Sequence, residues 1–153
     1  LTDFGGVLEI LNEISIFAGL EEGGLQQIFA TLGQAKFAAG DIIFREGTSP
    51  SHIYIVRSGR VRIVAGLDTT PLELVEFGTG QCFGETSVIG ILPHSASALA
   101  VAPTELIVFP RLALMAFFET DPRLFSVLVL NIAREACRRL HKTDKVLLHY
   151  VKH

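Results

Sequence analysis

The chain has 153 residues, of which 49% are hydrophobic and 19% charged, a composition typical of one compact globular domain rather than a disordered or fibrous chain. Its formal net charge of −3 argues against nucleic-acid binding, which depends on basic residues neutralising phosphates, so we expect no DNA binding by this segment alone. The longest strongly apolar stretch, around residues 124–133, is well short of the ~20 residues that span a bilayer, so no membrane segment is expected.

Residues 1–35 have the pattern of short helices. Apolar residues recur at helical spacing in two groups, Leu8 with Leu11 and Leu25 with Ile28. The stretch "FAGLEEGG" separates the groups. We therefore predict two short N-terminal helices joined by a turn.

Residues 36–109 change to the two-residue period of half-buried strands. Ile53 and Ile55 flank Tyr54, and Val61 and Ile63 flank Arg62. Glycine-containing turns punctuate the segment at strand-length intervals: Gly40, Gly47, Gly59, Gly66, Gly78 and Gly80. The pattern predicts an all-β core of antiparallel strands, as in a roll or sandwich.

After Pro110 the pattern returns to helix, first over 111–119 and then in a long helix that Asp121 can cap and that Pro122 opens. Along the long helix, residues at alternating three- and four-residue steps form one face, which we call the dimer seam: Ala133, Ala136, Leu140, Thr143, Leu147 and Tyr150. We predict a parallel homodimer through this face. The alternative, packing of the seam on the chain's own β-core, fits its first turns better than the region near Tyr150.

No grouping of residues indicates an enzyme or a metal site. Cys82 and Cys137 are far apart and form neither a metal-binding nor a disulfide pattern, which favours the reducing cytoplasm. The histidines lack metal-ligand spacing, and we expect these isolated residues on the surface: His52, His94, His141, His149 and His153. We predict no catalytic residues, no metal and no required cofactor.

The stretch "GTGQCFGETSVIG" indicates a ligand site. Gly84 precedes a short apolar segment, so the N–H groups of Glu85, Thr86 and Ser87 can begin one helical turn and bind an anion. Gly84 allows a ligand to approach the backbone, and Glu85 can accept a hydrogen bond from a sugar hydroxyl. Taken alone, Gly-Glu at a turn is a weak signal, and an ordinary loop glycine is the commoner explanation.

Several motifs in order make the chain resemble the cyclic-nucleotide-binding domain family, that of the catabolite activator protein and of kinase regulatory subunits. They are Gly40-Asp41 with Ile43-Phe44-x-Glu46-Gly47, Tyr54-x-Val56-x-x-Gly59, and Phe83-Gly84-Glu85 followed by Pro93 and Ser95-Ala96. The resemblance covers nearly the whole chain as a single domain. It implies a mainly β fold with flanking helices: an eight-stranded β-roll of double-stranded jelly-roll type, with short N-terminal helices and a long C-terminal helix.

The resemblance also implies a ligand site made of Phe83, Gly84, Glu85, Thr86, His94, Ser95 and Thr143. In the family, the segment matching Phe83 to Ala96 is the phosphate-binding cassette. Glu85 would take the ribose 2′-hydroxyl, while the amides near Thr86 and the Ser95 hydroxyl would face the cyclic phosphate. The stretch "RRLHKTDKV" would place Thr143 near the base.

His94 departs from the family pattern, which has an arginine at this position. A histidine lacks the fixed charge of a guanidinium and is mostly neutral at pH 7. We therefore expect a regulatory sensor domain, as in a transcriptional regulator, with weakened or altered binding of cAMP or cGMP that tightens as the pH falls toward 6. The alternatives are an interaction and dimerisation module that no longer binds cyclic nucleotides, and a different effector such as haem in the same cavity.

Overall fold

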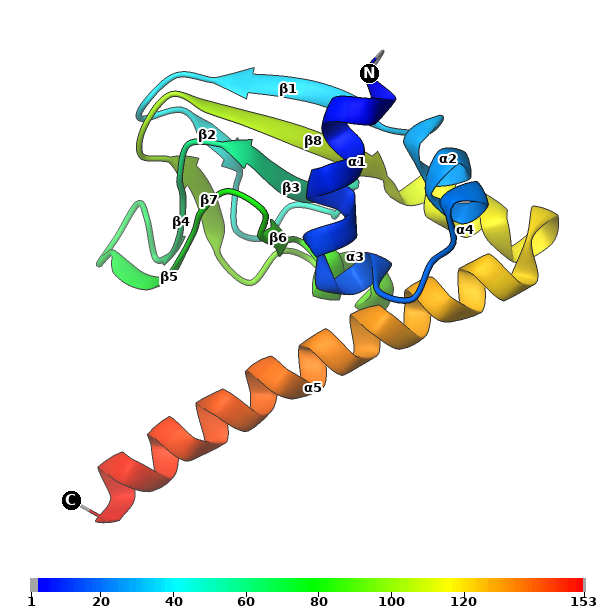
Figure 1. Ribbon diagram of the computed structural model, residues 1–153. Helices are drawn as coiled ribbons and strands as arrows, with labels where there is room; N and C mark the ends of the chain where they lie inside the picture. The colour runs from blue at the N-terminus through cyan, green and yellow to red at the C-terminus, as the bar shows by residue number, and fades with distance from the viewer. Residues whose placement is uncertain (1–2, 153) are drawn as a thin grey trace.

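The computed structural model describes residues 3–152, in which two four-stranded sheets are flanked by helices (Figure 1). In chain order the elements are α1 (Phe4–Glu13), the 3-10 helix η1 (Ser15–Phe17), α2 (Glu22–Phe29), β1 (Gly33–Phe37), β2 (Ile42–Phe44), β3 (His52–Ser58), β4 (Val61–Ala65), β5 (Leu72–Phe77), β6 (Cys82–Phe83), α3 (Glu85–Gly90), β7 (Ser97–Ala100), β8 (Thr104–Pro110), α4 (Arg111–Thr120) and α5 (Pro122–Lys152).

The sheets have strand orders β1-β8-β3-β6 and β2-β7-β4-β5, and every paired strand is antiparallel. In the first sheet Ile55 pairs with Ile107, and in the second Ile63 pairs with Ala98. Apolar side chains from both sheets fill the space between them, among them Val56, Val61, Phe77, Phe83 and Leu106. The predicted eight-stranded β-roll is confirmed.

A second core lies between the first sheet and the helices. Ile53 and Ile55 of β3 are fully buried there against side chains of α1, α2, α4 and the first part of α5. Because the helices cover the outer face of this sheet, β3 is buried on both sides. The half-buried pattern predicted for β3 was therefore wrong for Tyr54, which is buried inside the roll.

The roll also begins earlier than predicted. Gly33 starts β1 and pairs with Val108 of β8, so residues 33–35, assigned above to the N-terminal helical region, belong to the sheet. Exposed and half-buried residues alternate along β1, but the strand contains no strong β-former before Phe37. Pairing with β8 decides its conformation.

Helix α5 begins where the sequence predicts and is confirmed as the longest element of residues 3–152. The Asp121 carboxylate accepts a hydrogen bond from the Leu124 amide at 3.1 Å, which caps the helix. Asn131 ties α5 to the N-terminal segment by donating to the carbonyls of Ile16 (3.1 Å) and Ala18 (2.8 Å). Beyond this point α5 runs past the roll (Figure 1). Within residues 3–152, no helix has the length and apolar character needed to cross a membrane.

Candidate ligand pocket between the roll and the long helix

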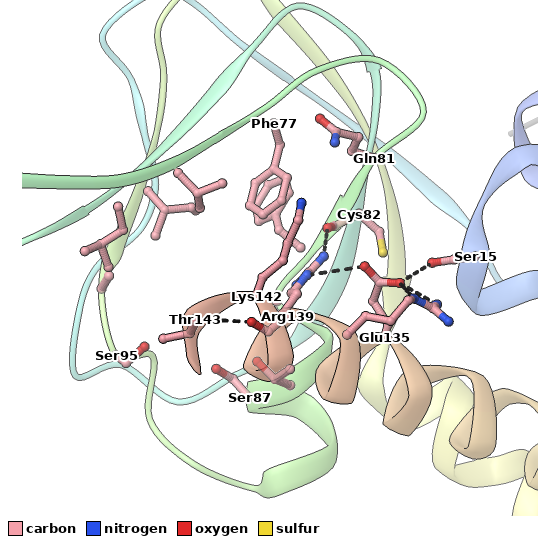
Figure 2. A pocket seen from close by; sticks show the side chains of 18 of the residues that line it. Ser15, Phe77, Gln81, Cys82, Ser87, Ser95, Glu135, Arg139, Lys142 and Thr143 are labelled. Carbon is pink, nitrogen blue, oxygen red and sulfur yellow. Dashed lines mark hydrogen bonds and ion pairs between the residues drawn. The ribbon is translucent and has the colours of Figure 1, made fainter. Parts of the chain in front are cut away.

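A pocket of about 1430 Å³ lies between the β-roll, the segment 83–96 and the middle of α5 (Figure 2). Six of the seven residues predicted for the ligand site line it: Phe83, Gly84, Thr86, His94, Ser95 and Thr143. The fold thus brings Thr143 of α5 beside residues that precede it by some fifty positions or more. The seventh residue, Glu85, does not line the pocket and lies buried beneath it.

Gly84 sets the conformation that starts α3. Its φ is 84°, in the left-handed region that favours glycine, and a Cβ atom there would lie 3.2 Å from the His52 carbonyl oxygen. Helix α3 then begins at Glu85, as the sequence predicts, and the first amides of a helix have no acceptor within it. Thr86 and Ser87, which carry such amides, both line the pocket. This is an arrangement suited to an anion.

Glu85 is held by the long helix. Its side chain is 0% exposed, and Arg139 of α5 donates a hydrogen bond to its Oε1. Arg139 also donates to the Cys82 carbonyl oxygen at 3.0 Å, and its guanidinium carbon lies 5.3 Å from the centre of the Phe77 ring (Figure 2). Burial raises the pKa of Glu85, and the positive charge of Arg139 opposes that rise. The carboxylate expected to bind a sugar is therefore paired with α5 in this structure.

The second carboxylate oxygen of Glu85 is unpaired, and Glu135 is a second carboxylate beside Arg139. Among residues 3–152, Glu85 Oε2 is buried with no hydrogen-bond partner. Glu135 lies 3.4 Å from Arg139 Nε and accepts hydrogen bonds from Ser15 (3.0 Å) and Arg138 (2.6 Å). Burial acts to raise the pKa of Glu135, but the hydrogen bonds from Arg138 and Ser15 outweigh it and leave that pKa lowered. Arg139 thus joins the cassette segment to a charged network that reaches the N-terminal region.

His94 lies inside the protein, so the expectation of a surface position is wrong for this residue. Only 4% of it is exposed, and its ring stacks on Phe44 with the ring centres 3.6 Å apart. Its backbone is fixed by the Gly47 amide, which donates to the His94 carbonyl, and by its own amide, which donates to Thr48. Burial lowers the pKa of His94 below 6.5, so the ring is neutral at pH 7. Protonated His94 would consequently strengthen anion binding only at a lower pH than the sequence suggests.

Sequence reasoning missed the basic residues of α5 in this pocket. Arg138, Arg139 and Lys142 all line it, together with Phe77 from β5. The signal was present in "RRLHKTDKV", whose cations lie within about one helical turn of Thr143.

The two cysteines also line the pocket. Burial, followed by the negative charge of Glu85, raises the pKa of the Cys82 thiol to about 12, which keeps this thiol unreactive.

Helix α3, within the cassette segment, ends in strained backbone. Ile91 follows α3 with a φ of 52°, and it is the non-glycine residue with positive φ in the described chain. A β-branched side chain is disfavoured in this conformation. Its side chain is 66% exposed, so little packing offsets the strain.

We therefore expect Ile91→Gly to stabilise the protein by about 1 kcal/mol, a rise of roughly 2–4 °C in the midpoint of thermal unfolding. Leu92→Gly is the matched control, because Leu92 is as exposed but has no positive φ. It should lower the midpoint. A midpoint lowered as much in Ile91→Gly as in Leu92→Gly would show that the turn stores no strain.

A family model described as "Cyclic nucleotide-binding domain" matches residues 34–121, more than half of the chain. The chain belongs to this family. The match starts in β1 and ends just before α5, so it contains all of the roll except Gly33, and the cassette segment. The helix that supplies Arg139, Lys142 and Thr143 lies beyond it.

Individual relatives extend the likeness into α5. A CRP-like cAMP-activated global transcriptional regulator of Mycobacterium tuberculosis is 29% identical over 140 residues, which is 91% of this chain and 61% of that protein. The catabolite activator protein of Thermus thermophilus has a TM-score of 0.77 and 29% identity over 90% of this chain and 63% of that one. A cyclic nucleotide-binding domain from Methylobacillus flagellatus, 22% identical, shares the fold with a TM-score of 0.81 over 95% of this chain and 83% of its own. The chain thus spans less than two thirds of the two regulators.

Proposed function

We propose that this chain is a non-enzymatic sensor domain of a transcriptional regulator, whose pocket takes a cyclic nucleotide or a related anionic phosphate ligand with weakened affinity. One observation carries the proposal: residues from the cassette segment and Thr143 of α5 line a single pocket. Membership of the cyclic nucleotide-binding domain family supports the ligand class. The likeness to two regulators that continue beyond the length of this chain supports the regulatory role.

In this proposal the ligand acts on α5 through Glu85. The phosphate would lie against the first amides of α3 and the Ser95 hydroxyl, and the ribose would approach Glu85 across Gly84. Arg139 pairs with Oε1 of Glu85, so a sugar hydroxyl that bonds the unpaired Oε2 would draw on the same negative charge and weaken the hold of the carboxylate on Arg139. The bound state then favours a different placement of α5, which is how a ligand shifts a conformational equilibrium.

The weakened affinity follows from His94. A neutral, stacked imidazole replaces the arginine of the family pattern and provides no permanent charge for the phosphate. Each charge-assisted hydrogen bond that is missing costs about 1.5–3 kcal/mol, or roughly ten- to a hundred-fold in affinity. The consequence is weaker binding than in a pocket with an arginine at this position.

The role of the pocket is tested by calorimetric titration of cAMP and cGMP into the natural chain and Ser95→Ala. We expect weak binding that Ser95→Ala reduces by about ten-fold, since the hydroxyl would donate to a charged phosphate. Ser126→Ala is the control, because this serine bonds the Pro122 carbonyl at 2.8 Å on α5, outside the pocket. Equal affinities for all three proteins would contradict the proposed position of the phosphate.

The proposal includes a homodimer through the dimer seam. None of the six seam residues is buried within the chain: Ala133, Ala136, Leu140, Thr143, Leu147 and Tyr150. Leu147 is 57% exposed and Tyr150 76%, although the first turns of α5 are buried on the chain's own core. Exposed apolar residues at coiled-coil spacing favour a partner helix.

We expect the natural chain to be dimeric and Leu147→Asp to be monomeric in light scattering after size-exclusion chromatography, because a buried carboxylate would oppose helix pairing. Lys145→Asp introduces the same side chain outside the seam and should remain dimeric. A monomeric natural chain, or a dimeric Leu147→Asp, would contradict this interface.

A second candidate, the interaction and dimerisation module without a cyclic nucleotide, is favoured by the pairing of Glu85 with Arg139, which already satisfies one carboxylate oxygen. Under this candidate the dimer forms as described, but neither cAMP nor cGMP binds. The titration separates the two functions.

A further inference from the structure

The positive charge that is free to meet a ligand in this pocket lies on α5. Arg138, Arg139 and Lys142 of the helix line the pocket, together with His141. Arg138 is paired with Glu135, and Arg139 with Glu85 and Glu135. Lys142 forms no ion pair or hydrogen bond with any part of residues 3–152, and Figure 2 shows its side chain extending from α5 into the pocket beside Phe77.

The other walls of the pocket provide neither a carboxylate that pairs with Lys142 nor a second cation that could take its place. The β-strand side near Phe77 is apolar, with Leu74 and Val75 of β5 both lining the pocket and partly exposed. The carboxylates that line the pocket are Glu13 and Glu135, which belong to its end near Ser15. Glu135 precedes Lys142 by seven residues, or about 10 Å along a helix. An ammonium group therefore remains uncompensated beside an aromatic ring.

The cassette segment lacks such a charge. His94 is neutral and stacked on Phe44, so this segment offers an anion only backbone amides and hydroxyl groups. A lysine on a flexible stem can supply the missing positive charge from the opposite wall. Phe77, packed at 5.7 Å against Phe83, provides a flat apolar surface next to it.

We infer that Lys142 is the cation that selects the ligand of this pocket, pairing with the anionic group of a cyclic nucleotide or related phosphate in place of an arginine at position 94. The inference rests on the proposed function, since it assumes that the pocket takes an anionic phosphate ligand. In this assignment the negative charge of the ligand is bound by α5, the helix that carries the dimer seam, instead of by the cassette segment. Binding of the anion then acts directly on α5.

The test measures the affinities of cAMP and cGMP for the natural chain, Lys142→Gln, Lys142→Arg and Lys145→Gln at low and high salt. We expect Lys142→Gln to weaken binding by about ten-fold and to reduce its dependence on salt, because one charge-assisted contact is lost. Lys142→Arg should retain most of the affinity. Lys145→Gln removes the same charge three residues away, outside the pocket lining, and should bind as the natural chain does.

The outcomes separate this inference from the proposed function. If the natural chain binds a cyclic nucleotide but Lys142→Gln binds equally well with the same salt dependence, the assignment of Lys142 is overturned and the proposed function stands. A loss in Lys142→Gln with unchanged salt dependence and no recovery in Lys142→Arg also overturns it, since the effect would then be structural. If the natural chain binds neither nucleotide at millimolar concentration, the proposed function fails and the assignment fails with it.

Discussion

The His94→Arg substitution is expected to tighten the binding of cAMP or cGMP by about ten- to a hundred-fold, because it restores a permanent charge and a bidentate donor to the cassette segment. The natural ring is neutral and stacked on Phe44, so the gain should outweigh the contact that is lost. Calorimetric titration near pH 8 measures the change. His52→Arg, which alters charge in the same way outside the pocket lining, is the control and should leave the affinity unchanged.

The same titration near pH 6 checks the state of His94. Burial lowers the pKa of His94 below 6.5, so any gain in affinity of the natural chain between pH 8 and pH 6 should be smaller than a histidine of ordinary pKa would give. The affinity of His94→Arg should be flat over this range. Equal affinities of the natural chain and His94→Arg would show that position 94 does not face the phosphate.

Arg139→Ala is expected to destabilise the protein by about 2–3 kcal/mol near neutral pH, because it leaves the carboxylate of Glu85 buried without its counter-charge. This value is at or below the lower end of the cost of removing one partner of a buried ion pair, because the Arg139 side chain is 35% exposed. Arg138→Ala is the control: its ion pair with Glu135 is more exposed, and its removal should cost less than about 1 kcal/mol. Urea denaturation of the three proteins measures the difference.

The stability loss in Arg139→Ala should shrink as the pH is lowered from about 7.5 to 5. Burial already raises the folded-state pKa of Glu85 above 4.5, and removing Arg139 takes away an effect that lowers it. The folded variant then binds a proton more tightly than the unfolded chain, so its free energy of unfolding rises as the pH falls through the raised pKa toward 4.5. A loss that is constant over this range would show that Arg139 stabilises the fold by packing instead of by charge.

Local pattern was sufficient for much of the architecture. The two-residue period and the spaced glycines indicate the strands and turns of the roll, and Asp121 with Pro122 marks the start of α5. These signals are local because turn conformation and helix capping depend on a few neighbouring residues. Tyr54 shows the limit of the approach: it is buried inside the roll while Ile53 and Ile55 on the opposite face of β3 are buried under the helices, and the alternation along the strand does not encode burial on both faces.

Local sequence likewise predicts some features of the candidate site but not those that depend on tertiary packing. The stretch around Gly84 predicts a helix start at Glu85, and the structure has one there. The pairing of Glu85 with Arg139 joins residues 54 positions apart and depends on where α5 crosses the roll, so no spacing in the sequence reveals it. The burial of His94, which lies in the loop between α3 and β7, likewise follows from the placement of Phe44 at the end of β2. The sequence therefore suggested the candidate ligand residues but not the contacts that couple them to the helix.

Backbone amide NMR during titration with cAMP and cGMP tests the central claim most directly, because it locates the ligand even when binding is weak. The account predicts progressive shifts for Gly84, Thr86, Ser95 and Thr143, which line the pocket, and no shifts for residues outside the pocket lining such as Asp68. Unchanged amides throughout the pocket at millimolar nucleotide, in a chain that remains folded, would contradict a sensor of cyclic nucleotides and leave the dimerisation module as its function.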